Sequence, residues 1–238
     1  MIRNIFFDLD STLLPMKDQD AFVNYYLGLL GKKVAAHGID PEGFIKVVYK
    51  AIKIMCSDDD TFTNEDTFFK IFNETYKDIE KDLKPVFLSF YANEFNEAAC
   101  KTHQNPDLIN LVKRLKAEGY NLVLATSPFF PRVAVLNRLR WAGLDESYFS
   151  HICSYEEYHY TKPNPKYFLE LLEKLELKPE ECVHIGNDVN EDYLPATSVG
   201  IKTFLLTDCL INPNNLDISK YNAGDIKALE EFIDKVCR

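Results

Sequence analysis

The chain contains 238 residues, of which 46% are hydrophobic, and its formal net charge at pH 7 is -10. The hydrophobic content excludes a disordered chain, and the length suits one large domain or a core with a smaller insert. The acidic charge disfavours nucleic acid polymers and acidic membranes as partners. No apolar stretch is long enough to span a bilayer, and the first apolar run begins too close to Met1 for a signal peptide. We therefore expect a cytoplasmic protein, and the sequence makes no prediction about its oligomeric state.

The first part of the chain predicts one strand followed only by helices. The apolar run 5–7 predicts the strand, and apolar residues at helical spacing follow from 22 to 95. By this spacing most aromatic residues of the region belong to a core, and a few could line a pocket. The acidic run 58–60 lacks the glycine and the ligand spacing of a calcium loop, so it predicts a solvated connection between helices.

From residue 106 onward, helical and strand patterns alternate. This order is typical of a parallel sheet with helices on both faces, so the predicted fold class is α/β with a three-layer, Rossmann-like core. Helices are predicted over residues 108–119, 131–143, 165–175, after 192 and over 226–236. Strands are predicted over residues 121–125, 151–154, 182–185 and 201–206.

Two carboxylates follow the first strand, at Asp8 and Asp10. Because alternate side chains of a strand share one face, both would point into the same site. Two carboxylates that face each other repel, which is tolerable where a cation or a proton-transfer role uses the charge. The pair therefore indicates a metal site or an acid/base pair, and the alternative is a solvated turn rich in Asp and Ser.

Other reactive side chains follow the later strands. Ligands of such sheets bind beyond the carboxyl ends of the strands, so these side chains could converge on one crevice. Taken singly, Thr126 could instead cap the next helix and Lys162 could be a surface lysine. The candidates are Thr126 and Ser127 after the second strand, Lys162 after the third, and Asn187, Asp188 and Asp192 after the fourth.

Taken together, these residues form four motifs in a known order, and the chain resembles the haloacid dehalogenase-like hydrolase superfamily. The D-x-D-x-T motif is at Asp8 to Thr12, the Ser/Thr motif at Thr126, and a Lys followed by Pro at Lys162. Asp188 and Asp192 fit the D-x-x-x-D form of the fourth motif. The resemblance covers about the whole chain. It implies a core domain of residues 1–15 and 104–238, and an all-helical cap domain of residues 16–103.

The resemblance also implies the roles of these residues in a Mg²⁺-dependent phosphatase. Asp8 would attack phosphorus and form an aspartyl-phosphate, and Asp10 would act as general acid and then as general base. Thr126 and Lys162 would bind the phosphoryl group, with Ser127 adding a further contact. The metal ligands would be Asp8, the backbone carbonyl of Asp10, and Asp188.

The fourth motif departs from the common family pattern, in which an Asp follows the glycine. That place holds Asn187, and Asp188 comes next. The three residues between Asp188 and Asp192 favour Asp188 as the metal ligand, while Asn187 and Asp192 are the alternatives.

A helical cap that closes over the crevice would hinder a macromolecular substrate. We therefore expect a small soluble phosphate monoester such as a sugar phosphate, a nucleotide or an organic acid phosphate. Lys17, Tyr25, Tyr26 and Phe129 are close enough in sequence to contact it, although a core role is favoured for the aromatic residues. A phosphomutase of the same superfamily and a non-catalytic module that binds phosphate esters are the alternative functions.

Overall fold

The computed structural model describes residues 2–77 and 83–237, so residues 78–82 of the predicted helical insert lie outside it. The strands are β1 (Asn4–Phe7), β2 (Asn121–Leu124), β3 (His151–Ile152), β4 (Cys182–Gly186), β5 (Lys202–Leu206) and β6 (Ala223–Gly224). The helices before β2 are α1 (Gln19–Ala35), α2 (Pro41–Met55), α3 (Asn64–Thr75), α4 (Lys84–Ala92), the 3₁₀ helix η1 (Glu94–Lys101) and α5 (Pro106–Ala117). Those after β2 are α6 (Arg132–Trp141), the 3₁₀ helix η2 (Glu146–Tyr148), α7 (Lys166–Lys174), the 3₁₀ helix η3 (Pro179–Glu181), the π-helical turn η4 (Val189–Tyr193), α8 (Leu194–Ser198) and α9 (Ile226–Cys237).

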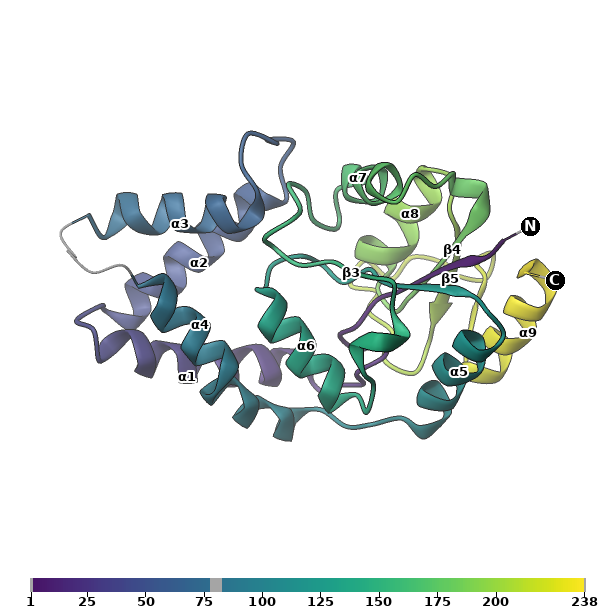
Figure 1. Ribbon diagram of the computed structural model, residues 1–238, viewed down its shortest axis with the longest axis horizontal. Helices are drawn as coiled ribbons and strands as arrows, with labels where there is room; N and C mark the ends of the chain where they lie inside the picture. Colours follow the sequence, from purple (N-terminus) through teal and green to yellow (C-terminus); the bar gives the residue numbers. More distant parts are fainter. Residues whose placement is uncertain (1, 78–82, 238) are drawn as a thin grey trace.

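The six strands form one parallel sheet in the order β3-β2-β1-β4-β5-β6. Successive residues of β1 face opposite sides: Ile5 and Phe7 join the apolar cluster that includes α5 and α9, while Phe6 joins the cluster of α7 and α8. Helices therefore cover both faces (Figure 1). The strands are apolar on both sides because both faces are buried. The predicted three-layer α/β core is confirmed.

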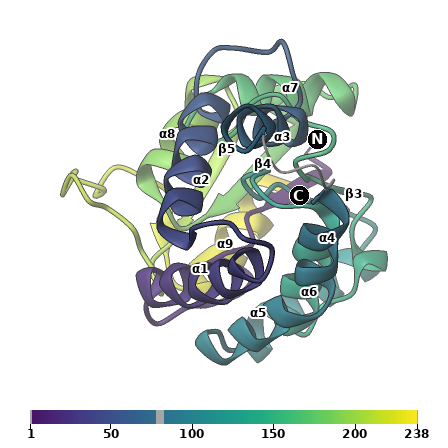
Figure 2. The ribbon, with the colours of Figure 1, turned by 90° about the vertical axis from the view of Figure 1, so that its left-hand side faces the viewer.

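Helices α1 to α4 and η1 lie between β1 and β2 in the chain and extend away from the sheet (Figure 1). α1 packs against α2, and α2 against α3 (Figure 2). The acidic run at 58–60 lies in the exposed connection between α2 and α3, as predicted. No helix within the described ranges is long and apolar enough to cross a membrane.

The chain enters and leaves this helical region at adjacent points. Met16 and Thr102 form an isolated antiparallel bridge, and the N–H of His103 donates to the carbonyl of Pro15 at 3.1 Å. These contacts fall at the boundaries predicted for the insert. The division into a core domain and a cap domain remains a prediction.

Several predicted ends differ from the structure for local reasons. α5 begins at Pro106 rather than at 108, because the side chain of Asn105 accepts from the first free N–H groups and proline suits the first helical position. The helix predicted after residue 192 is preceded by η4, because the Asp188 side chain caps the chain earlier. The predicted strand over 151–154 is only two residues long. β6 was not predicted, since Ala223 and Gly224 carry no apolar pattern.

Candidate active site

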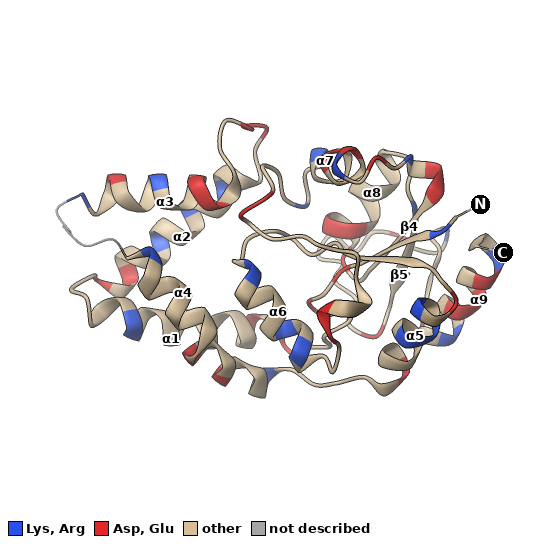
Figure 3. Ribbon diagram, viewed as in Figure 1, with Lys and Arg blue, Asp and Glu red and all other residues tan. Residues whose placement is uncertain are grey.

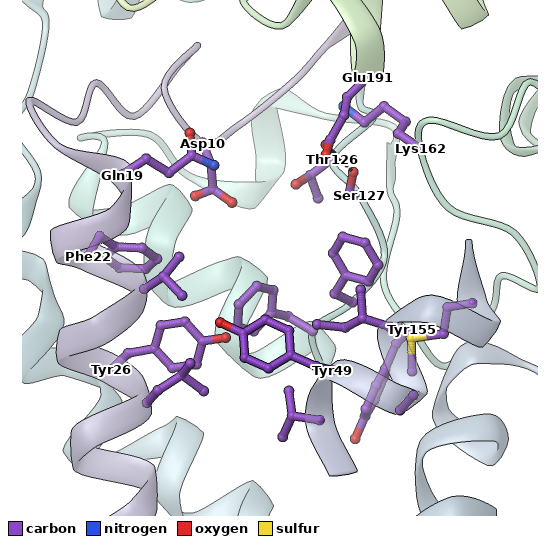
Figure 4. A pocket seen from close by; sticks show the side chains of 18 of the residues that line it. Asp10, Gln19, Phe22, Tyr26, Tyr49, Thr126, Ser127, Tyr155, Lys162 and Glu191 are labelled. Atoms are coloured by element: carbon purple, nitrogen blue, oxygen red, sulfur yellow. Dashed lines mark hydrogen bonds between the residues drawn. The ribbon is translucent and has the colours of Figure 1, made fainter. Parts of the chain in front are cut away.

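The four motifs meet at the carboxyl edge of the sheet. Asp8 follows β1, Thr126 follows β2, Lys162 lies between β3 and α7, and Asp188 follows β4. Together with Asp10, these residues line one cavity of about 380 Å³. Ser127, Asn187 and Asp192 also line it. Asp10, Thr126 and Lys162 are labelled in Figure 4. The structure thus brings the predicted catalytic, phosphate-binding and metal-binding residues to one cavity.

Lys162 links two carboxylates in the interior. Its side chain is only 1% exposed, and Nζ donates to Oδ1 of Asp8 at 2.7 Å and to Oδ1 of Asp192 at 2.6 Å. Although burial disfavours the charged form, Asp192 and Asp8 raise the pKa of the lysine, so it stays an ammonium. The alternative of a surface lysine is wrong.

Asp192 is the better anchored of the two carboxylates. Its Oδ2 accepts the backbone N–H groups of Asn187 and Asp188, each at 3.0 Å, and Oδ1 lies 3.0 Å from Nε2 of His184. Burial alone would raise the pKa of Asp192, but Lys162 and His184 lower it. Asp192 therefore stays ionised, and it fixes both Lys162 and the loop after β4.

Asp8 is left with less stabilisation of its charge. Burial raises the pKa of Asp8 to about 7. Lys162 lowers this pKa, but Asp8 shares the lysine with Asp192, and the negative charges of Asp192 and Asp10 raise the pKa again. Lys162 is accompanied in the cavity lining by five carboxylates, namely those of Asp8, Asp10, Asp188, Glu191 and Asp192. The charge balance and the oxygen donors fit an added divalent cation.

Oxygen atoms for such a cation remain available on two of these side chains. Asp8 uses Oδ1 for Lys162, and Asp188 uses Oδ1 to accept the N–H groups of Asn190 and Glu191 at 2.6 and 2.9 Å. No hydrogen bond from any described residue reaches the Oδ2 atom of Asp8 or of Asp188. No group of three or more His, Cys, Asp or Glu side chains within the described ranges is arranged to hold a metal by itself. A site here would therefore need other oxygen ligands, such as backbone carbonyls and water.

Within the described residues, both polar atoms of the Asn187 side chain already have hydrogen-bond partners, unlike those of Asp188. Its Oδ1 accepts from the hydroxyl of Thr12 at 2.9 Å, and its Nδ2 donates to the carbonyl of Cys209 at 2.8 Å. The side chain thus ties the first motif, the fourth motif and the loop after β5 together.

Asp10 has a partner that sequence reasoning missed, Arg138 of α6. The fully buried guanidinium pairs with Oδ2 of Asp10 and lies over the ring of Phe130, 4.1 Å from its centroid. Burial raises the pKa of Asp10, and Arg138 opposes that effect. Nothing in the sequence separates Arg138 from Arg132 and Arg140 of the same helix, which are exposed.

Glu191 is a second cavity residue that the motifs did not single out. Its Oε2 lies 3.5 Å from the hydroxyl of Ser127, and burial raises its pKa to about 7. The sequence indicates a site role for Glu191 only through its place beside Asp192 in the fourth motif.

The alternatives for Thr126, for the carboxylate pair and for the nearby residues can also be judged. Thr126 is 2% exposed, and α6 has no side-chain cap, so the helix-cap interpretation of Thr126 is wrong. Asp8 is buried, so the solvated-turn interpretation does not hold for it. Tyr26 and Phe129 line the cavity, whereas Lys17 and Tyr25 do not.

Comparison with known proteins agrees with this geometry. The family model of the haloacid dehalogenase-like hydrolases matches residues 2–200. The chain is 27% identical to glyceraldehyde 3-phosphate phosphatase of Methanothermobacter thermautotrophicus, across 98% of this chain and 100% of that protein. It is 24% identical to pyrophosphatase PpaX of Halalkalibacterium halodurans, across 85% and 82% of the two chains. The crystal structure of a HAD phosphatase from Thermococcus onnurineus has the same fold, with a TM-score of 0.60 and 21% identity over 98% of both chains.

Proposed function

The chain belongs to the haloacid dehalogenase-like hydrolases, and we propose that it is a Mg²⁺-dependent phosphatase of a small phosphate monoester. The observation that carries this proposal is the convergence of Asp8, Asp10, Thr126 and Lys162 on one cavity. The likeness to a phosphatase and a pyrophosphatase supports the same type of reaction.

In the first step, a carboxylate oxygen of Asp8 attacks phosphorus and forms an aspartyl-phosphate. The bond between phosphorus and the alcohol oxygen breaks, and Asp10 gives its proton to that oxygen. Lys162 and the hydroxyl of Thr126 stabilise the charge that develops on the phosphoryl oxygens. Asp192 acts by holding Lys162 in place.

In the second step, water hydrolyses the aspartyl-phosphate. Asp10, now ionised, takes a proton from the water as its oxygen attacks phosphorus, and Asp8 is released as a free carboxylate. Inorganic phosphate leaves, and Asp10 is again protonated for the next ester. We propose that Arg138 positions Asp10 for both transfers, because it is the side chain paired with this carboxylate.

Mg²⁺ would neutralise the repulsion between these carboxylates and the phosphate dianion. We assign Asp8, Asp188 and the backbone carbonyl of Asp10 as its ligands. The free Oδ2 atoms of Asp8 and Asp188 support this assignment, because Mg²⁺ prefers oxygen donors. Asn187 is a second choice, because its amide oxygen is neutral and already accepts from Thr12.

We further propose that residues 16–103 act as a cap over the site. The helices of this region supply one wall of the cavity. The isolated bridge between Met16 and Thr102, where the chain enters and leaves the region, is one place where a hinge could lie. Closure would exclude water from the aspartyl-phosphate until the alcohol has left.

The experiment that tests the function is phosphate release from a panel of small esters, with Mg²⁺ or with EDTA. We expect release only with Mg²⁺, and none from Asp8→Asn. Transfer of phosphate between two hydroxyls without release would identify a phosphomutase instead. Tight binding of esters without either reaction would identify a binding module, and both results would contradict the phosphatase.

A further inference from the structure

Charged groups line only one end of the cavity. Asp10, Lys162 and Glu191 lie at that end (Figure 4), and the charged lining residues all belong to the loops that follow the strands or to η4. The lining residues within 16–77 and 83–103 include no Asp, Glu, Lys, Arg or His. Helices α1 to α4 do carry charged residues (Figure 3), but none of these lines the cavity.

The opposite end is a closely packed aromatic wall. Phe44 is fully buried and its ring is stacked on that of Phe87 at a centroid distance of 5.7 Å. The ring of Phe87 also meets those of Phe72 at 5.3 Å and Phe68 at 5.7 Å. Because each ring is held by its neighbours, this wall keeps an apolar surface toward the cavity.

Polar groups on this wall are few and neutral. They are the hydroxyls of Tyr26, Tyr49, Tyr91 and Tyr155, whereas the amide of Gln19 lies beside Asp10 at the charged end (Figure 4). Burial raises the pKa of Tyr26 and of Tyr91, so both phenols stay protonated. The hydroxyls of Tyr26 and Tyr49 point toward the middle of the cavity (Figure 4).

From this division we infer that the alcohol part of the substrate is apolar and uncharged, as in an alkyl or aryl phosphate. This inference rests on the proposed phosphatase function and adds the class of leaving group. The phosphoryl group would lie at the end that holds Lys162, and the carbon chain would lie against the wall of α1 to α4. The cavity volume of about 380 Å³ limits the substrate to a small molecule.

The same wall disfavours the polar esters that the sequence suggested. A second phosphate or carboxylate would be buried without a cation, since Lys162 is already shared by two carboxylates and Arg138 is paired with Asp10. The several hydroxyls of a sugar would lose water and find only the four phenols of this end. Both kinds of group therefore lose free energy on entering.

Binding of alkylphosphonates tests the inference without turnover, because their carbon–phosphorus bond is not cleaved by this reaction. Titration calorimetry would compare methyl-, propyl- and hexylphosphonate with the Mg²⁺-loaded enzyme. We expect the affinity to rise about fourfold with each added methylene until the cavity is filled. An affinity that is flat or falls with chain length would overturn the inference.

Turnover of matched esters then separates the leaving group from the reaction. Hexyl phosphate is compared with glucose 6-phosphate, and propyl phosphate with glycerol 1-phosphate, so each pair has the same number of carbons. We expect kcat/KM to favour the hexyl ester by about tenfold or more. A preference for the polyol esters that Asp8→Asn abolishes would overturn the inference and leave the phosphatase intact. Absence of turnover with the expected binding series would contradict the phosphatase alone.

A pair of variants on α2 locates the effect. Ile52 lines the cavity, while Ile45 of the same helix is also half-buried but does not. We expect Ile52→Ala to weaken hexylphosphonate binding about tenfold and methylphosphonate less than about twofold. Ile45→Ala is expected to change neither. Equal losses for both phosphonates in Ile52→Ala, or equal effects of the two variants, would show that the chain does not lie against this wall.

Discussion

Different interactions hold the side chains at the two ends of the cavity. At the sheet edge several reactive side chains are positioned by charged partners, as in the pairs of Lys162 with Asp8 and Asp192 and of Arg138 with Asp10. At the helical end, rings such as Phe44 and Phe87 are positioned by packing alone. We therefore expect that the chemical step and the choice of substrate can be altered separately. Changes at the sheet edge should alter rate, and changes at the wall should alter which ester binds.

We expect Asp8→Asn to have the largest effect, because it should abolish turnover at the charged end and leave binding at the apolar end intact. The substitution is nearly isosteric and removes the nucleophile, so we expect turnover to fall by at least about a thousandfold. Hexylphosphonate binding should persist, because its chain contacts the other end. Phosphate release and calorimetry measure the two properties.

Asp20→Asn, at an exposed position of α1, is the matched control and should retain full activity. If Asp8→Asn kept substantial turnover, another group would have to be the nucleophile. If it lost alkylphosphonate binding as completely as turnover, the two ends would not be independent.

A large effect on stability is expected from Arg138→Met. The variant keeps an apolar stem against Phe130 but leaves the carboxylate of Asp10 without its cation. We expect the free energy of unfolding to fall by about 3 kcal/mol, the low end for a broken buried pair because Asp10 faces the cavity. Urea denaturation measures it.

The cause can be isolated by repeating Arg138→Met in the Asp10→Asn background, where no charge is stranded. There the loss should shrink to about 1 kcal/mol. Arg140→Met, at an exposed position of the same helix, should change stability by less than about 0.5 kcal/mol. An equal loss in both backgrounds would assign the effect to packing rather than to the ion pair.

The Mg²⁺ requirement should distinguish Asp188 from its neighbour Asn187. Asp188→Ala removes a charge with a free oxygen, whereas Asn187→Ala removes a neutral amide that is already hydrogen-bonded. We therefore expect Asp188→Ala to raise the Mg²⁺ concentration for half-maximal activity about tenfold or more, and Asn187→Ala by less. The reverse order would move the ligand to Asn187.

The fold could be predicted from the sequence to a large extent, because its strands are buried on both faces. Apolar runs such as 182–185 alternate with helical patterns, and only a parallel sheet with helices on both sides buries all of them. Features that lack an apolar pattern were missed. β6 consists of Ala223 and Gly224 at the sheet edge, and η4 depends on a side-chain cap by Asp188.

The positions of side chains that follow strands could be predicted, as for Asp8 after β1 and Thr126 after β2, whereas their roles in catalysis stay predictions. Partners that the tertiary fold supplies were not predictable. Arg138 is one of several arginines on α6, and only packing against Phe130 separates it from the exposed ones. The sequence predicts the aromatic residues of the wall mostly as core and a few as pocket lining, but it cannot say which ones line the cavity, because a lining and a core share the same helical spacing.

The smallest effect should arise where the two regions touch, at Asn64. This buried residue at the start of α3 donates its N–H to the carbonyl of Tyr158 at 2.7 Å and its amide to the carbonyl of Pro128 at 3.2 Å. Asn64→Ala keeps the backbone bond and removes the side-chain bonds to the carbonyls of Pro128 and Tyr160, so the helical wall should be less firmly held against the loops that follow β2 and β3. We expect kcat/KM for hexyl phosphate to fall about threefold and stability by about 1 kcal/mol.

Binding of inorganic phosphate, which needs only the charged end, should stay within about twofold in Asn64→Ala. Asn24→Ala, at an exposed position of α1, controls for the loss of an amide side chain. A parallel loss of phosphate affinity would mean that Asn64 supports the charged end as well. The positions of the wall and of the catalytic groups would then be coupled through this contact rather than set separately.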